Sequence, residues 1–256
     1  MSQVVLVVGG SGGIGSATTK YFSEQGATTF STYLNNEAHA QHIKKNLRNC
    51  ETIQCDIRNE NDVNSMVSHI IKTESKLDVL INCVTRPLKL KTFDRMTAQE
   101  YFEDLEVILY GSALLAKAVL PHMKERRAGT IVNLLSTVVS GIPPIRMASY
   151  VIAKYGLLGL SKCLASEVDR FNIKVLGLSP TFVETALLRS FPEKLLEIER
   201  EKQEGNTLLQ PKDIARALWQ IAQNAEKYPN GENILIRTKK DILNMETGLE
   251  LRNKDQ

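Results

Sequence analysis

A glycine-rich turn near the amino terminus is the feature that most restricts the fold of this chain. The run Gly9-Gly10-Ser11-Gly12-Gly13-Ile14-Gly15 follows the apolar pentapeptide Val4–Val8 and opens a helical pattern that reaches Gln25. The Gly-x-Gly-x-x-Gly spacing lets the chain turn tightly and approach a pyrophosphate with no Cβ in the way. The helix that follows offers free N–H groups and its positive dipole end to the anion. Strand, turn and helix in this order favour nucleotide binding over a merely tight turn.

Short β-branched runs alternate with helical patterns along the chain, which predicts a parallel sheet covered by helices. Asn59 is a predicted helix N-cap, and Thr97 with Glu100 forms a predicted capping box. Pro211 suits the first turn of a further helix. The fold class is therefore α/β, a single doubly wound parallel sheet with helices on both faces. We predict strands at 4–8, 28–33, 51–55, 77–82, 130–135, 173–178 and 232–236, and helices at 14–25, after 59, at 97–123, 149–170 and 211–223.

One domain accounts for residues 1–237. Neither a linker-like stretch nor an internal repeat interrupts the 256 residues, a length at which doubly wound folds often form one unit. Two charged segments stand outside the alternation, an insertion at 184–209 and a tail at 238–256. We expect both to be solvated. Long connections in compact folds are also where lids occur, so residues 184–209 are a candidate substrate lid.

Composition excludes several classes of protein. The chain has 32 basic and 29 acidic residues, a balance that argues against a nucleic-acid partner. The cysteines at 50, 55, 83 and 163 lack zinc-site spacing, so we predict no metal and interpret them as reduced thiols. The chain starts without a leader segment and has no run near 18 apolar residues, so we expect a cytoplasmic protein with no membrane span.

Tyr150 and Lys154 lie one turn apart near the start of the helix predicted at 149–170, so their side chains share one face. A nearby ammonium group lowers the pKa of a phenol, which can then give a proton to a carbonyl oxygen or take one from an alcohol. An ordinary pair on a helix surface is the alternative. Ser136, at the end of a predicted strand, can donate to the same substrate oxygen and favours the catalytic interpretation.

In this order the motifs resemble those of the short-chain dehydrogenase/reductase family, over about residues 4–236. The resemblance implies a Rossmann-like sheet of about seven strands and hydride transfer with a nicotinamide cofactor. It also implies Ser136 as oxyanion donor, Tyr150 as general acid/base and Lys154 as its pKa modulator and ribose ligand. The segments 116–123 and 129–133 resemble 3-oxoacyl-carrier-protein reductases in particular.

The resemblance implies cofactor and substrate residues as well. Asp56 and Asn82 would lie at the adenine and ribose side, although Asp56 could equally cap a helix and Asn82 could tie adjacent strands. Thr185 could reach a nicotinamide carboxamide. The full cofactor set is Gly9, Ser11, Gly12, Gly13, Ile14, Gly15, Tyr33, Asn35, Asn36, Asp56, Ile57, Asn82, Cys83, Lys154, Pro180, Val183 and Thr185. The substrate set is Phe182, Leu187 and Leu188, with Phe191 as a further apolar lining residue.

The residues at the end of the second predicted strand indicate whether the cofactor is NAD or NADP. Members that prefer NAD usually place an acidic residue there, and members that prefer NADP place a basic one nearby. The segment Thr32-Tyr33-Leu34-Asn35-Asn36 has neither, so no carboxylate would repel a 2′-phosphate and the polar side chains could donate to it. We therefore predict NADP(H) over NAD(H).

Several positions depart from the family pattern. Asn82-Cys83-Val84-Thr85 replaces the usual Asn-Asn-Ala-Gly, and Arg237-Thr238 replaces a glycine pair. Ile108 falls where the family keeps an asparagine that helps to hold a proton-relay water. Two hypotheses follow. The first is NADPH-dependent reduction of a ketone to a secondary alcohol, with a 3-oxoacyl thioester as a candidate substrate. The alternative is a cofactor-binding but catalytically weak or silent member that acts as a partner subunit.

Two surface features bear on partners. Arg127, in the basic cluster 124–127, matches an arginine that meets the acidic carrier in carrier-protein reductases. The second such position falls at Phe171, beside Arg170, and a solvated helix end is the alternative interpretation. The family commonly pairs through the helices here placed at 97–123 and 149–170, where Gly156 and Gly159 would permit close approach. We expect a homodimer or homotetramer.

Overall fold

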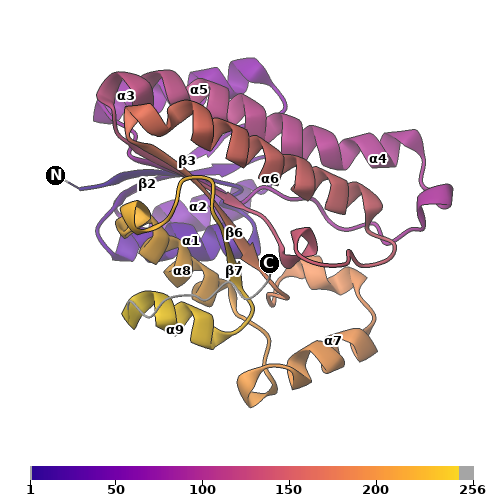
Figure 1. Ribbon diagram of the computed structural model, residues 1–256. Helices are drawn as coiled ribbons and strands as arrows, with labels where there is room; N and C mark the ends of the chain where they lie inside the picture. The colour runs from indigo at the N-terminus through magenta and orange to yellow at the C-terminus, as the bar shows by residue number, and fades with distance from the viewer. Residues whose placement is uncertain (1, 248–256) are drawn as a thin grey trace.

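The computed structural model describes residues 2–247, except the side chain of His39, and its centre is a parallel sheet (Figure 1). The sheet has seven strands in the order β3-β2-β1-β4-β5-β6-β7. This Rossmann-like arrangement confirms the predicted fold class. The strands are β1 (Val4–Val8), β2 (Thr28–Tyr33), β3 (Cys50–Gln54), β4 (Val79–Asn82), β5 (Gly129–Leu134), β6 (Ile173–Pro180) and β7 (Asn233–Ile236).

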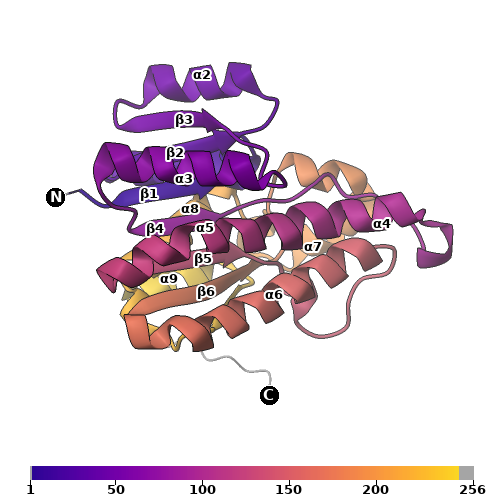
Figure 2. The same cartoon turned by 90° about the horizontal axis from the view of Figure 1, so that it is seen from above.

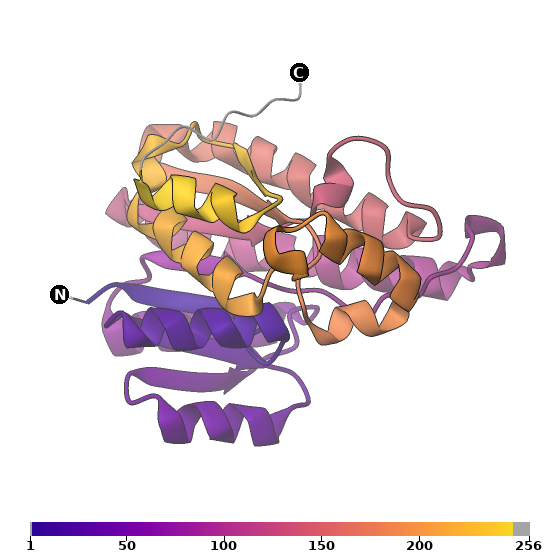
Figure 3. The same cartoon turned by 90° about the horizontal axis from the view of Figure 1, so that it is seen from below.

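Helices cover both faces of the sheet (Figures 2 and 3). Alternate residues of β1 show how the two layers form. Val4, Leu6 and Val8 belong to one buried cluster with residues of α3 and α5, whereas Val5 and Val7 belong to a second with residues of α1 and α8. Because both faces are buried, this strand is a continuous apolar run. One layer comprises α3 (Glu60–Glu74), α5 (Gly111–Arg126) and α6 (Ala148–Val168), and the other α1 (Gly13–Glu24), α8 (Pro211–Gln223) and α9 (Lys239–Thr247).

The predicted helix starts are confirmed. The Asn59 side chain accepts from the backbone N–H groups of Asn61 and Asp62 at the start of α3. Thr97 and Glu100 form the capping box of α4 (Ala98–Asp104). Pro211 is the first residue of α8. Local capping chemistry therefore sets these boundaries.

Three charged helices were not predicted. They are α2 (Glu37–Asn46), beside β3 at the sheet edge, α7 (Glu193–Glu201), within the insertion, and α9, which begins the tail (Figures 1 and 2). The tail was expected to be solvated, yet Ile242 of α9 is buried and Glu246 forms an ion pair of 2.6 Å with Arg216 of α8. Residues 248–256 of the predicted tail lie outside the described residues. Short charged helices of this kind bury too few apolar side chains to give a clear periodic signal.

The predicted helix at 97–123 is longer and irregular. A π-helical turn, Leu105–Tyr110, joins α4 to α5, and the helical run ends at Arg126. Within residues 2–247, Ala98–Arg126 is the one helical stretch long and apolar enough to cross a membrane, with a mean hydropathy of 1.3. Several of its apolar side chains, such as Leu115, Val119 and Met123, lie in the buried cluster on the sheet.

Asp78 secures the start of β4 at the amino edge of the sheet. Its carboxylate accepts from the backbone N–H of Val4 at 2.9 Å and pairs with Lys76 at 2.7 Å and Arg126 at 3.0 Å. Partial burial alone would raise the pKa of this carboxyl, but the bonds from Lys76, Val4 and Arg126 outweigh it and lower the pKa. One side chain therefore joins β1, β4 and α5.

Asp78→Ala should lower the free energy of unfolding by about 2 kcal/mol at neutral pH, because it leaves a backbone N–H and two cations without their acceptor. The lowered pKa of the folded state means that Asp78 stabilises the fold above the ordinary carboxyl pKa of 3.8 and loses this effect as the pH falls further. Urea denaturation of both proteins at neutral and acid pH measures the difference. An equal difference at both pH values would contradict this role of the ionised carboxylate.

Candidate active site

A cavity of about 730 Å³ opens at the carboxyl edge of the sheet. The loops that follow β1, β4, β5, β6 and β7 all contribute to its wall. Sheet order reverses between β1 and β4, and such a switch point is where open α/β sheets bind ligands. The cavity brings together these predicted site residues: Gly12, Gly13, Ile14, Gly15, Cys83, Ser136, Tyr150, Lys154, Pro180, Phe182, Val183, Thr185, Leu187 and Leu188.

The glycine turn has the geometry that a pyrophosphate requires. Gly9 has φ +81°, and the Gly12 N–H donates to the Gly9 carbonyl at 3.0 Å. A Cβ at Gly15 would lie 2.1 Å from the Gly9 carbonyl oxygen, so only glycine fits there. No side chain at the N-cap of α1, Gly12, occupies the first N–H groups of that helix. The turn therefore fits the phosphates of a dinucleotide.

Ser136, Tyr150 and Lys154 converge on the cavity from β5 and α6. The two α6 side chains are almost fully buried, with Tyr150 6% and Lys154 1% exposed. Ser136 lines the same cavity as the phenol of Tyr150 and opposes the rise in the phenol pKa that burial causes. The Lys154 Nζ lies 5.8 Å from the centre of the Tyr150 ring and donates to the Leu134 carbonyl at 2.6 Å. The structure therefore places together the three side chains that the sequence singled out.

Burial controls the protonation of this group. Burial raises the pKa of Tyr150 to about 12, with the charge of Asp104 adding to the rise and Ser136 opposing it. Burial also lowers the pKa of Lys154 to about 8. Burial sets the direction of the Tyr150 pKa in this structure, and the role of Lys154 in lowering that pKa stays a prediction. Tyr150 is a neutral phenol at neutral pH.

Asn82 belongs to a buried network beneath the cavity. Its Nδ2 donates to Ser112 Oγ at 2.7 Å and to Asn133 Oδ1 at 2.9 Å, and Asn133 Nδ2 donates to Ser161 Oγ at 2.9 Å. Asn82 is 2% exposed and is not in the cavity wall. Of its two interpretations, the structure favours the one in which it ties strands, here β4 and β5 to α5 and α6. The other three members were not predicted as site residues, because contacts between elements far apart in the chain bring them together.

Ile108 lies at the π-helical turn and is fully buried. It packs in a cluster with Tyr150 and Leu88. Its carbonyl accepts from Ser112 Oγ at 2.5 Å. An apolar side chain therefore occupies the position next to Tyr150 where the family resemblance implied an amide.

The remaining predicted cofactor residues lie outside the cavity wall. Tyr33 ends β2, and Asn35 and Asn36 follow it. Asp56 follows β3 and binds Arg58 through both carboxylate oxygens, a bond that lowers the pKa of Asp56. Helix α3 is capped by Asn59, so Asp56 does not fill the capping role considered for it. Those outside the wall are Gly9, Ser11, Tyr33, Asn35, Asn36, Asp56, Ile57 and Asn82.

The insertion at 184–209 covers one side of the cavity. Leu188 forms a small buried cluster with Leu196 and Leu208, and Leu187 packs against the Tyr150 cluster. The Ser190 hydroxyl donates to the Leu88 carbonyl at 3.0 Å, and Gln203 Nε2 donates to the Arg237 carbonyl at 2.9 Å. The insertion is thus bonded to the segments after β4 and β7.

Thr185 links the insertion to the glycine turn. A Cβ at Gly13 would lie 2.8 Å from Thr185 Cγ2, so these residues are in close contact. The rings of Phe182 and Phe191 lie 5.3 Å apart, edge to face, and both line the cavity. The insertion therefore places a polar side chain at the phosphate turn and aromatic side chains farther out.

Known proteins resemble this chain in sequence and in fold. Residues 3–196 match the family model described as short chain dehydrogenase. A 3-oxoacyl-[acyl-carrier-protein] reductase of Thermotoga maritima is 27% identical over 238 residues, which are 91% of this chain and 95% of that protein. Secoisolariciresinol dehydrogenase of Forsythia intermedia is 30% identical over 246 residues, 91% of this chain and 87% of that protein.

A solved structure agrees with these relatives. The 3-ketoacyl-(acyl-carrier-protein) reductase of Brucella melitensis, complexed with NADH, superimposes with a TM-score of 0.84 at 25% identity, covering 94% of this chain and 98% of that one. Fold, site and relatives agree: this chain belongs to the short chain dehydrogenase family and is an NAD(P)-dependent oxidoreductase that acts on CH–OH and C=O groups.

Proposed function

We propose that this protein reduces a ketone to a secondary alcohol with NADPH, and that Tyr150 is the proton donor. The observation that carries the proposal is the buried phenol of Tyr150, kept neutral by its raised pKa, in a cavity that Ser136 and the glycine turn also line. When bound, the reduced nicotinamide supplies the hydride. Tyr150 gives its proton to the carbonyl oxygen, and Ser136 orients that oxygen by donating a hydrogen bond.

Lys154 would hold the ribose hydroxyls of the cofactor, for which its ammonium is positioned at the cavity wall. The glycine turn would hold the pyrophosphate, and Thr185 would hold the carboxamide end. NADP(H) is proposed because the segment after β2 carries no carboxylate to repel a 2′-phosphate. The Brucella melitensis relative is complexed with NADH, so the preference needs a direct test.

A hydrophobic ketone is the substrate class that the wall supports best. Leu187 and Phe191 line the cavity from the insertion, and Phe182 lines it from the segment just before the insertion. A 3-oxoacyl thioester fits this description, and the Thermotoga maritima relative is named for such a substrate on a carrier protein. Acetoacetyl coenzyme A is therefore the first probe to use.

The basic residues considered for carrier docking gather around one ring. Lys124, Arg127 and Arg170 lie 5.4, 5.8 and 4.8 Å from the centre of the Phe171 ring. They follow the carboxyl ends of α5 and α6, at the edge of the sheet opposite the cavity. A carrier bound there would not face the Tyr150 of the same subunit. The carrier-bound form of the substrate is thus supported by the relatives and not by this patch.

Self-association through α4 and α6 is also proposed. Phe102, Tyr110, Ile152 and Tyr155 are exposed on these helices and the turn between α4 and α5. A Cβ at Gly156 would lie 2.8 Å from Leu109 of the same chain, so this glycine makes room within the subunit. Gly159 has open space and keeps its proposed role in close approach of a partner.

A cytoplasmic location is proposed from cysteine chemistry. All four cysteines are free thiols, although Cys55 and Cys83 are buried. Free thiols suit a reducing compartment. The catalytically silent alternative rests on Ile108 and on the altered segment Asn82–Thr85, whereas the cavity wall that contains Ser136, Tyr150 and Lys154 opposes it. The substitutions below separate the two.

Tyr150→Phe should abolish NADPH-dependent reduction of acetoacetyl coenzyme A and leave NADPH binding unchanged, because it removes only the proton donor. Loss of at least about 100-fold in kcat is expected for a general acid. Absorbance of NADPH measures turnover, and fluorescence titration measures binding. Retained turnover in the variant would refute the proposed role, and tight binding without turnover in the unsubstituted protein would favour the silent alternative.

Lys154→Met should raise the free energy of unfolding by about 2 kcal/mol at neutral pH while it removes activity. The folded-state pKa of Lys154, about 8, lies below the ordinary 10.5, so burial of the charged amine destabilises the fold at lower pH. This destabilisation is complete at pH values below about 8, the pKa of Lys154 in the folded protein, and it disappears as the pH rises to 10.5. Urea denaturation at both extremes checks the sign. A less stable variant at neutral pH would contradict the explanation.

Tyr33→Asp should lower the preference for NADPH over NADH by about tenfold or more, because a carboxylate at the end of β2 repels a 2′-phosphate. The ratio of kcat/KM values for the two cofactors is the measurement. Tyr33→Phe is the matched control and should leave the ratio almost unchanged. An unaltered ratio in the acidic variant would place the 2′-phosphate elsewhere.

A further inference from the structure

The loop at residues 140–147, which precedes α6, has an exposed apolar tip. We define the apolar tip as residues 142–145, whose sequence is Ile-Pro-Pro-Ile. Ile142 is 97% exposed and Ile145 is 84% exposed, more than the other large apolar side chains in the described part of the chain. Apolar side chains that gather on an exposed surface mark places where an apolar partner binds.

The apolar tip belongs to the wall of the active-site cavity. Ile142 and Pro144 both line that cavity. Of the exposed large apolar side chains that the structure describes, Ile142 is the one in the cavity wall. Val138 and Leu187 also line the cavity, and they pack against the buried cluster around Tyr150. The apolar wall of the site therefore extends outward to a surface that is in contact with solvent.

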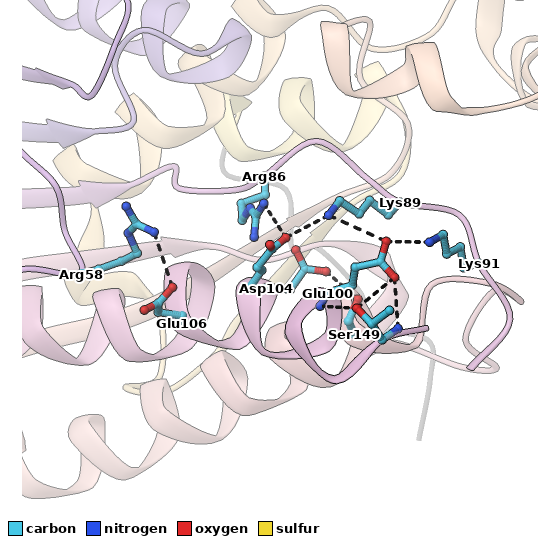
Figure 4. A network of polar contacts seen from close by, with 10 residues as sticks. Arg58, Arg86, Lys89, Lys91, Glu100, Asp104, Glu106 and Ser149 are labelled. Carbon is cyan, nitrogen blue, oxygen red and sulfur yellow. Dashed lines mark hydrogen bonds and ion pairs between the residues drawn. The ribbon is translucent and has the colours of Figure 1, made fainter. Parts of the chain in front are cut away.

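Two hydrogen bonds hold the chain just after the apolar tip. The backbone N–H of Lys91 donates to the Arg146 carbonyl at 3.2 Å. Three residues later, the Ser149 hydroxyl donates to Asp104 of α4 at 2.6 Å (Figure 4). Within the apolar tip, each of the two prolines fixes one backbone dihedral angle. Little conformational entropy is therefore lost when a ligand covers this surface.

The cations of the neighbouring loop after β4 are paired with carboxylates of α4. Arg86 and Lys89 pair with Glu103 at 2.8 and 3.0 Å. Lys91 pairs with Glu100 at 2.6 Å (Figure 4). Because these charges balance one another, the exposed isoleucines and not these cations distinguish this side of the cavity mouth.

Another part of the cavity wall is polar. It is formed by α7, the residues after α7 and the residues after β7, and it includes Glu199, Lys202, Gln203, Arg237 and Thr238. A substrate with an apolar chain and a polar group matches both parts of the wall. An acyl thioester of coenzyme A or of a carrier protein has this character, since its acyl chain is apolar and its pantetheine arm is polar.

We propose that Ile142 is a specificity-determining residue, and that the apolar tip binds the chain of a medium- or long-chain 3-oxoacyl thioester where that chain leaves the cavity. This inference rests on the proposed function. With the ketone at Tyr150, the acetoacetyl group has a single methyl group beyond the reacting carbon, whereas a longer acyl group extends toward the cavity mouth. Each methylene group that covers Ile142 removes apolar surface of both partners from water, which strengthens binding.

Two variants with the same substitution test this role. Ile142→Ser removes most of the apolar side chain from the apolar tip. Ile198→Ser is the matched control, because Ile198 is 43% exposed on α7 and is not in the cavity wall. Both isoleucines are exposed, so neither substitution opens a cavity in the core, and both variants should fold. Ile142→Ala replaces the serine variant if the latter does not fold.

The primary measurement is the kcat/KM for 3-oxododecanoyl coenzyme A divided by that for acetoacetyl coenzyme A, with NADPH and below the concentrations at which the thioesters form micelles. In the unsubstituted protein this ratio should exceed one. Ile142→Ser should lower it about tenfold, mainly by raising KM for the longer thioester, because an apolar contact with the chain is lost. Ile198→Ser should leave the ratio in place.

The second measurement does not depend on turnover. Dodecanoyl coenzyme A has no 3-oxo group and cannot be reduced, and its affinity in the presence of NADPH is measured by calorimetric titration. Ile142→Ser should weaken this binding about tenfold, whereas Ile198→Ser should not change it.

An unchanged ratio and affinity in Ile142→Ser, or an equal fall in Ile198→Ser, would overturn the proposal. So would loss of self-association in Ile142→Ser without a change in the ratio, measured by analytical ultracentrifugation, because the apolar tip would then be a contact between subunits. If the unsubstituted protein reduces neither 3-oxoacyl thioester, the proposed function fails instead. The affinity for dodecanoyl coenzyme A still decides the role of Ile142 in that case.

Discussion

Burial of both faces of the parallel sheet is the constraint on which the rest of the molecule depends. Most strand side chains are buried and apolar on both faces, so the residues of the cavity lie just beyond the carboxyl ends of the strands. The glycine turn, Ser136 and the segment after Pro180 all occupy that edge. The buried amides of Asn82 and Asn133 satisfy one another and bind the central strands to the helices beneath the site.

The same burial sets the chemistry of the site. In water, an ammonium beside a phenol favours phenolate, but here removal from water dominates and the phenol stays protonated. The same burial lowers the pKa of Lys154, because it disfavours the charged form of the amine. A protonated phenol suits the proposed donation of a proton to a developing alkoxide.

Ile108 and the insertion show how this chain modifies a shared framework. The π-helical turn around Ile108 places apolar bulk against the Tyr150 cluster. The insertion contributes Leu187 and Phe191 to the cavity wall and is bonded to the segments after β4 and β7. Both features make the surroundings of the phenol drier. A dry wall strengthens the electrostatic interactions of the charges inside it.

The sequence by itself determined the fold class, the phosphate turn, the capped helix starts and the group of Ser136, Tyr150 and Lys154, because each depends on local spacing. It did not predict helices α2, α7 and α9, because each of them is mostly charged and has only a narrow buried apolar face. Only the tertiary structure decided that Gly156 receives Leu109 and that Tyr150 and Lys154 are almost fully buried. These outcomes depend on contacts between residues far apart in the chain and on how much water the packing removes. The spacing of residues along the sequence predicts neither.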